Sequence, residues 1–87
     1  MTLYSLKLYN VKQMEVSLLE LFKDFSMKLK QMRLAEKLTQ REVAAEIGIT
    51  YQSYQAYEAG ITLPTLENFM KLCVFFDVTP NDMLGIK

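Results

Sequence analysis

Histidine is absent from the sequence, and cysteine occurs only once. The absence of histidine removes the side chain that most often serves in acid–base catalysis and in metal binding. The lone cysteine, Cys73, excludes an intramolecular disulfide framework and fits a reducing compartment. No glycine-rich phosphate loop and no nucleophile–base set is recognisable, so we expect no enzyme activity, no metal and no cofactor. Free cysteines are usually buried, and we expect Cys73 in the core.

Proline and glycine are scarce, and long apolar runs are missing from the 87 residues. With 51% hydrophobic residues, the chain suits one small folded domain rather than a disordered segment. No stretch approaches the about 20 apolar residues that span a membrane. Because Lys7, Asn10 and Lys12 interrupt the N-terminal segment, we expect no signal peptide. A cytoplasmic protein without a membrane partner is the expectation.

A charge excess of one sign is also missing, since the chain has 10 basic and 10 acidic residues. The charges are nevertheless segregated. Residues 23–41 hold six basic and two acidic side chains, whereas residues 42–87 hold two basic and six acidic ones. Such a domain can present an attractive face to phosphate while remaining neutral overall. A solvated basic helix explains the same pattern, so charge alone does not decide between the two.

The spacing of apolar residues predicts a short strand followed by helices. Residues 3–9 alternate between apolar and polar side chains, as a strand does. From Val11 onward the spacing becomes that of a helix face, at Leu18, Phe22, Phe25, Leu29 and Met32.

We expect a break in this helical pattern near residue 24, because Asp24 or Ser26 can cap a new helix. The break would separate an N-terminal extension, residues 1–23, from a domain at residues 24–87. The extension would then hold the strand and a helix at residues 11–23.

Two short helices joined by a tight turn are predicted next. Thr39 and Glu42 have the spacing of a capping box at the start of the first helix. Gly48 is expected to end it with a positive φ. Thr50 can cap a second helix that runs over residues 51–59. Two helices joined by so short a glycine-containing turn form the helix-turn-helix pattern.

Two further helices are predicted at the C-terminal end. Thr65 can cap a helix whose core-facing residues repeat every three or four positions, at Leu66, Phe69, Cys73 and Phe76. Thr79 followed by Pro80 predicts the start of a last, short helix.

The ordered set of motifs over residues 29–84 resembles the helix-turn-helix domain of the phage repressor and Cro family, also called the XRE family. The matching motifs are "L-T-Q", "A-x-x-I-G-I-T", "Y-E-A-G", "P-T-L" and "D-V-T-P-N-D-M-L". The resemblance covers about two-thirds of the chain. It implies an all-α, five-helix, lambda-repressor-like fold, here with an extra N-terminal strand and helix. It also implies a bacterial or phage-encoded protein that binds a pseudo-palindromic double-stranded DNA operator as a homodimer.

The resemblance implies that helix 51–59 lies in the major groove. At about 100° per residue, Tyr51, Gln52 and Gln55 share one face of this helix. The side-chain amide of glutamine can accept from adenine N6 and donate to N7, and Tyr51 can contact a thymine methyl or a phosphate. Without the resemblance, this face would be interpreted as ordinary polar surface. Tyr54 and Tyr57 match apolar family positions, so we expect their rings in the core and their hydroxyls at its edge.

The remaining candidate contacts are with the DNA backbone. Thr39, Gln40 and Arg41 stand at a helix N-terminus, whose free N–H groups suit phosphate, although a solvated Arg41 explains that residue equally well. Thr50 and Ser53 are candidates at the next helix start. Arg33 and Glu58 match a family pair, and we expect a partly buried ion pair there because an unpaired carboxylate would be costly.

Two features depart from the family pattern or lie outside it. Ile61 and Thr62 stand where many members carry a basic residue, so one phosphate contact is missing. Met70, Val74 and Phe75 lie off the core stripe and need a cover. A second copy is one candidate. The N-terminal segment, with Leu18, Leu19, Leu21 and Phe22, is the other.

We expect residues 1–23 to extend a dimer interface, with residues 3–9 pairing strand to strand. No site for a small-molecule ligand is evident. Two function classes remain open. One is a transcriptional regulator, in the first place a repressor. The other is an antitoxin or a similar protein-binding regulator with the same fold.

Overall fold

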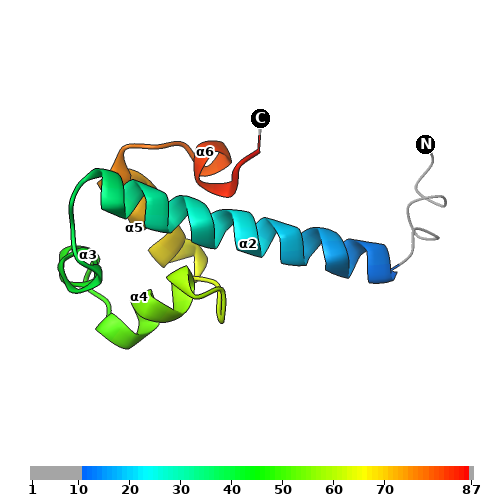
Figure 1. The fold of residues 1–87 in the computed structure, drawn as a ribbon, viewed down its shortest axis with the longest axis horizontal. Coiled ribbons are helices and arrows are strands. Elements are labelled where there is room, and N and C mark those ends of the chain that lie inside the picture. The colour runs from blue at the N-terminus through cyan, green and yellow to red at the C-terminus, as the bar shows by residue number, and fades with distance from the viewer. Residues whose placement is uncertain (1–10, 87) are drawn as a thin grey trace.

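The computed structural model of the chain describes the backbone of residues 11–86 and the side chains of residues 18–86. Every regular element in this range is a helix, as expected (Figure 1). The elements are α2 (Val11–Ala35), α3 (Gln40–Ile47), α4 (Tyr51–Glu58), α5 (Leu66–Phe76) and α6 (Pro80–Leu84). The strand expected at residues 3–9 lies outside the described residues. No helix in the described range is long and apolar enough to cross a membrane.

The expected break near residue 24 is wrong, because α2 is one continuous helix of 25 residues. Ser26, a candidate cap, is buried, and its hydroxyl donates to the backbone carbonyl of Tyr57 at 2.8 Å. Its hydrogen-bonding capacity therefore serves tertiary packing instead of a new helix start. Phe25 and Leu29 continue the apolar face into the core. The N-terminal half of α2 projects beyond the other helices (Figure 1).

Four threonines begin the four shorter helices, as the sequence predicts. The hydroxyl of each accepts a hydrogen bond from the backbone N–H three residues later, at 3.1 or 3.2 Å. These bonds satisfy N–H groups that a helix start leaves free. The residues are Thr39, Thr50, Thr65 and Thr79. Gly48 ends α3 with a φ of +75°, as expected, and lets the chain turn directly into α4.

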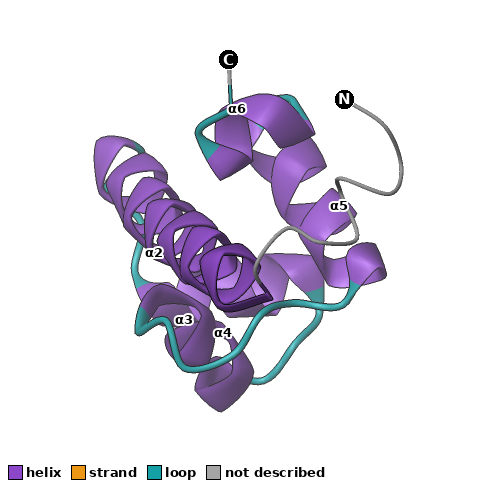
Figure 2. Ribbon diagram, turned by 90° about the vertical axis from the view of Figure 1, so that its right-hand side faces the viewer, coloured by secondary structure: helices purple, strands orange, loops and turns teal. Residues whose placement is uncertain are grey.

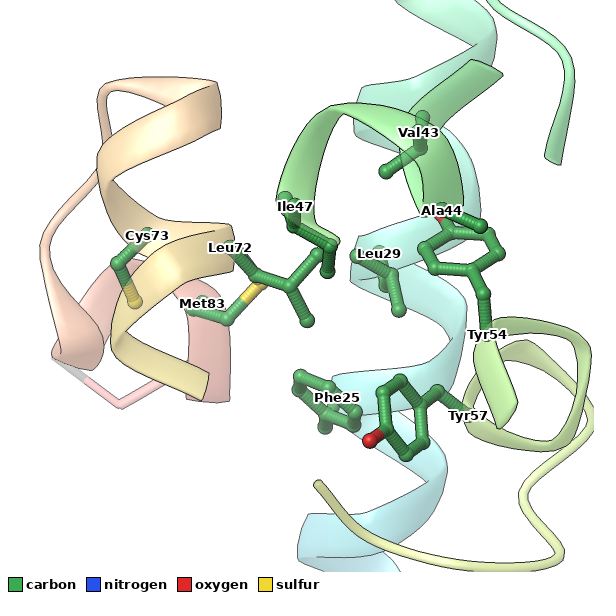
Figure 3. Packing of buried hydrophobic residues seen from close by; sticks show 10 residues of the cluster. All are labelled: Phe25, Leu29, Val43, Ala44, Ile47, Tyr54, Tyr57, Leu72, Cys73 and Met83. Atoms are coloured by element: carbon green, nitrogen blue, oxygen red, sulfur yellow. The ribbon is translucent and has the colours of Figure 1, made fainter. Parts of the chain in front are cut away.

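The core lies where α2 crosses the shorter helices (Figure 3). Phe25 of α2 and Phe69 of α5 pack with their ring centroids 5.9 Å apart. Cys73 is 3% exposed and therefore belongs to the core, as predicted. Leu66 does not, because it is 77% exposed at the first turn of α5. Its spacing fits the predicted core-facing positions of α5, but no other described helix covers the first turn of α5. The sequence pattern missed Leu72, which is fully buried.

The arrangement of the helices gathers α3 and α4 at one side of the molecule. α2 packs against α4 and α6, whereas α3 packs against α4 and α5. Figures 1 and 2 both show α3 and α4 together, on the side away from α6. The helix-turn-helix unit therefore presents its outer surface to solvent while α2 supports it from behind.

Candidate nucleic-acid interface

The two faces of α4 are occupied by different residue types. Tyr54 and Tyr57 are 0% and 5% exposed, and their rings meet edge to face at 6.5 Å between centroids. Figure 3 shows both rings pointing from α4 into the core. Gln52 and Gln55 are exposed on the other face. The aromatic anchors thus fix which side of α4 meets solvent.

The two tyrosine hydroxyls have different surroundings. The hydroxyl of Tyr57 accepts a hydrogen bond from Nδ2 of Asn68 at 3.1 Å, near the surface. The hydroxyl of Tyr54 is completely buried and makes no hydrogen bond of good geometry within the described residues. The expectation that it reaches the edge is wrong, because α4 lies close against α2. Burial, and next the neighbouring Glu58 carboxylate, raise the pKa of Tyr54.

Arg33 and Glu58 lie in direct contact between α2 and α4. Nε of Arg33 donates to Oε2 of Glu58 at 2.6 Å, and Nη2 donates to Oε1 at 2.9 Å. Nη1 donates to the carbonyl of Leu38 at 2.9 Å, so the guanidinium also holds the loop before α3. The hydrogen bond to Glu58 raises the pKa of Arg33. Burial acts to raise the pKa of Glu58, but the hydrogen bonds that Arg33 and Gln40 donate to its carboxylate act against burial, and the pKa is lowered.

Gln40 connects this ion pair to the start of α3. Its Nε2 donates to Oε1 of Glu58 at 3.2 Å, a contact that the sequence did not predict. One amide N–H is therefore used inside the fold. The second N–H makes no hydrogen bond within the described part of the chain and is available to another group.

The first turn of α3 keeps free donors. Thr39 and Glu42 form the predicted capping box, in which the Thr39 hydroxyl accepts from the Glu42 N–H and Oε1 of Glu42 accepts from the Thr39 N–H. The backbone N–H groups of Gln40 and Arg41 have no partner among the residues described. Free N–H groups at a helix start attract anions, although the Glu42 carboxylate in the same turn offsets part of this effect.

Arg41 and Tyr51 form a contact between the starts of α3 and α4. The Arg41 guanidinium carbon lies 4.0 Å from the centroid of the Tyr51 ring. Arg41 is exposed and Tyr51 is partly exposed. Neither residue type nor spacing along one helix indicates this contact, because it depends on how α3 and α4 cross.

Thr50 and Ser53 are engaged with each other at the start of α4. The Thr50 hydroxyl accepts from the Ser53 N–H at 3.1 Å and donates to the Ser53 hydroxyl at 2.9 Å. Ser53 keeps a hydroxyl proton that can be donated outward. Ile61 and Thr62, beyond the end of α4, are exposed and uncharged. The polar candidates therefore gather on the α3 and α4 surface, and no group of three or more metal-ligating side chains occurs in the described range.

Comparison with known proteins identifies relatives of this chain. A family model described as helix-turn-helix matches residues 29–83. The cryptic phage CTXphi transcriptional repressor RstR of Vibrio cholerae is 38% identical over 58 residues, which are 67% of this chain and 52% of the repressor. The uncharacterized HTH-type transcriptional regulator YobD of Bacillus subtilis is 37% identical over 62 residues, 71% of this chain and 55% of that protein.

A solved structure shares the fold. The restriction-modification controller protein C.AhdI from Aeromonas hydrophila superposes with a TM-score of 0.66 and 26% identity, over 71% of this chain and 94% of the controller. The chain spans about half the length of the two regulators above. Since the family model matches more than half of its residues, the chain belongs to the XRE-type helix-turn-helix family.

Proposed function

We propose that this chain is a transcriptional regulator that binds double-stranded DNA sequence-specifically, with α4 in the major groove. The observation that carries the proposal is the division of α4 into two faces. Tyr54 and Tyr57 anchor one face in the core, so Gln52 and Gln55 must point outward. Each of these amides can bond adenine at N6 and N7. Tyr51 lies on the same face, where it could contact a thymine methyl or a phosphate.

Contacts with phosphate would position α4 in the groove. The start of α3 offers free backbone N–H groups, one amide N–H of Gln40 and the exposed guanidinium of Arg41. At the start of α4, Ser53 offers a hydroxyl proton, and the Thr50 hydroxyl orients this group by donating its own proton to it. Because these donors lie in the first turns of both helices of the motif, they would hold the DNA backbone beside the groove that α4 enters. Because the proposed partner is DNA, the proposed location of the chain is the cytoplasm.

A second copy of the chain would cover the apolar side of α5. Val74 and Met70 are 77% and 43% exposed. They belong to an open groove of about 600 Å³ lined by Glu46, Ile47, Glu67, Met70, Lys71, Val74 and Phe75. No described residue of α2 lines this groove, so α2 leaves it uncovered. A two-fold dimer would bind a pseudo-palindrome with half-sites about 34 Å apart.

The N-terminal segment, residues 1–23, would enlarge that dimer interface. Leu18 and Leu19 are 48% and 56% exposed on the projecting half of α2. Apolar side chains in such a position gain stability when another chain covers them. Repression is the proposed outcome of binding, because a dimer seated on an operator occludes it, and RstR is named as a repressor.

The proposal is tested by measuring duplex binding as salt is raised from about 50 to 200 mM. We expect a steep loss of affinity and a preference for selected over random duplexes. Gln52→Ala should weaken binding at particular base pairs, whereas Gln31→Ala, an exposed glutamine on α2, should change nothing. Equal losses on all sequences would remove Gln52 as a base contact, and salt-insensitive binding would refute the proposal.

The α5 groove also supports a second candidate, an antitoxin or similar protein-binding regulator. Its apolar lining suits a protein helix as well as a second copy. In that case the chain would co-purify with the product of a neighbouring gene and show no affinity for any duplex. Sequence-specific DNA binding by a dimer for which no neighbouring gene product co-purifies decides against it.

A further inference from the structure

The further inference concerns Tyr51, and it rests on the proposed function. We infer that Tyr51 is a positioning residue for Arg41. Its ring holds the guanidinium for a phosphate contact, and it makes no base-specific contact itself. Of the three residues on this face of α4, only Gln52 and Gln55 would then contact bases.

Arg41 lies over the ring of Tyr51. The Arg41 guanidinium carbon lies 4.0 Å from the Tyr51 ring centroid, well within the range of a cation–π contact. One face of the ring is therefore occupied by the guanidinium. A thymine methyl packs against a ring face, so Arg41 competes with that contact on the face that it occupies.

Arg41 keeps hydrogen-bond donors free above the Tyr51 ring. In a parallel arrangement the guanidinium contacts the ring through its planar face, and its five N–H donors point outward in the same plane. Arg41 makes no salt bridge with any carboxylate in the described residues. Its donors are thus available for an anion while the ring restrains the side chain. Restraint before binding reduces the side-chain entropy that is lost when the contact forms.

Arg41 lies beside free backbone donors in the first turn of α3. It is the second residue of a helix whose first two backbone N–H groups have no partner among the described residues. The guanidinium and these N–H groups together provide donors suited to a phosphate. Tyr51 begins α4, so the stack also ties the phosphate contact to the helix that lies in the groove.

Duplex binding by four variants tests the inference. Arg41→Ala should weaken binding equally on selected and random duplexes and lower the salt slope by about 1. Tyr51→Leu should weaken it roughly two- to fivefold, again equally on both duplexes. Tyr51→Phe keeps the ring and is the matched control, which should bind like the original chain. Both positions reach solvent, so all variants should keep their helical circular dichroism.

The double variant Arg41→Ala/Tyr51→Leu separates positioning from independent contact. If Tyr51 acts through Arg41, the double variant binds like Arg41→Ala alone. Additive losses, a Tyr51→Leu effect confined to particular base pairs, or a loss in Tyr51→Phe would overturn the inference. If the original chain binds no duplex, the proposed function fails instead. The stack can then be judged separately by the ring-current shift of the Arg41 side-chain protons, which Tyr51→Leu should abolish.

Discussion

Arg33 of α2 and Glu58 of α4 meet through two parallel hydrogen bonds, at 2.6 and 2.9 Å. Their side chains are only 10% and 3% exposed, so this is an ion pair largely withdrawn from water. Planar, two-point contacts of this kind fix orientation as well as distance. Gln40 joins the same carboxylate from α3. The pair therefore sets the position of both helices of the helix-turn-helix unit relative to α2.

Removing one partner of this pair should cost more than removing both. Arg33→Met leaves the Glu58 carboxylate buried without its cation, and Glu58→Leu leaves the guanidinium likewise. Each should lower the free energy of unfolding by about 3–5 kcal/mol. In Arg33→Met/Glu58→Leu no uncompensated charge remains, so the loss should be smaller than for either single variant. Urea unfolding at neutral pH measures all three.

Lys71 and Glu67 provide the matched comparison. They form an ion pair at 3.5 Å on one face of α5, with side chains 43% and 79% exposed. Solvent screens such a pair, so Lys71→Met or Glu67→Leu should change the free energy of unfolding by less than about 1 kcal/mol. If the loss of unfolding free energy in Arg33→Met/Glu58→Leu equals the sum of the losses in the two single variants, the two side chains contribute independently and the ion pair adds nothing.

Stability should also fall in acid because the pKa of Glu58 is lowered in the folded chain from its ordinary value of 4.5. A lowered folded pKa means that the contribution of the pair is complete above about pH 4.5 and is lost as pH falls through the folded pKa. The free energy of unfolding should therefore drop on acidification. It should drop more steeply than in Arg33→Met/Glu58→Leu, which keeps every other carboxylate.

In Arg33→Met, the contribution of Glu58 to the free energy of unfolding should change with pH in the opposite direction. Without the cation, burial dominates and raises the pKa of the Glu58 carboxyl. The destabilisation caused by Arg33→Met is then largest near neutral pH and shrinks as the carboxyl becomes protonated. Urea unfolding at intervals between about pH 7 and pH 4 measures this, and a destabilisation that grows on acidification would contradict it.

Much of the fold could be predicted because its turns depend on local chemistry. A threonine hydroxyl reaches the N–H three residues later, so the caps at Thr39 and Thr50 are visible in the sequence itself. The break expected near residue 24 failed for the opposite reason. Ser26 bonds the carbonyl of Tyr57, 31 residues away, and no local pattern shows that its hydroxyl is already used.

In the candidate site, too, the features within one helix could be predicted and the contacts between helices could not. Helical geometry separates Gln52 and Gln55 from Tyr54 and Tyr57, and the burial of the two rings agrees with that separation. The contacts of α3 with α4, Arg41 on Tyr51 and Gln40 on Glu58, depend on the crossing of two helices. Periodicity along the chain describes one helix at a time and cannot specify such a crossing.

The two core tyrosines should respond differently to loss of their hydroxyls. Tyr57→Phe removes the bond from Asn68 and should lower the free energy of unfolding by about 0.5–1.5 kcal/mol. Tyr54→Phe removes a buried hydroxyl that makes no hydrogen bond of good geometry in the described residues, so it should be neutral or stabilise by up to about 1 kcal/mol. The two rings remain in place in both variants, which makes each the control for the other. A larger loss for Tyr54→Phe than for Tyr57→Phe in thermal unfolding would contradict this prediction.

Val74→Glu should separate dimer formation from folding. Val74 is 77% exposed in the single chain, so a glutamate there leaves the core intact and should change the free energy of unfolding of the monomer little. If a second copy covers α5, the same change buries two carboxylates in an apolar interface and should weaken the dimer at least about tenfold. Leu34→Glu, at a 53% exposed position on α2, adds the same charge elsewhere and should leave the dimer unchanged. Sedimentation over a range of concentrations measures the association. A dimer that survives Val74→Glu would place the interface away from α5. If one dimer binds both half-sites together, the affinity for a duplex with two half-sites should fall as the dimer is weakened.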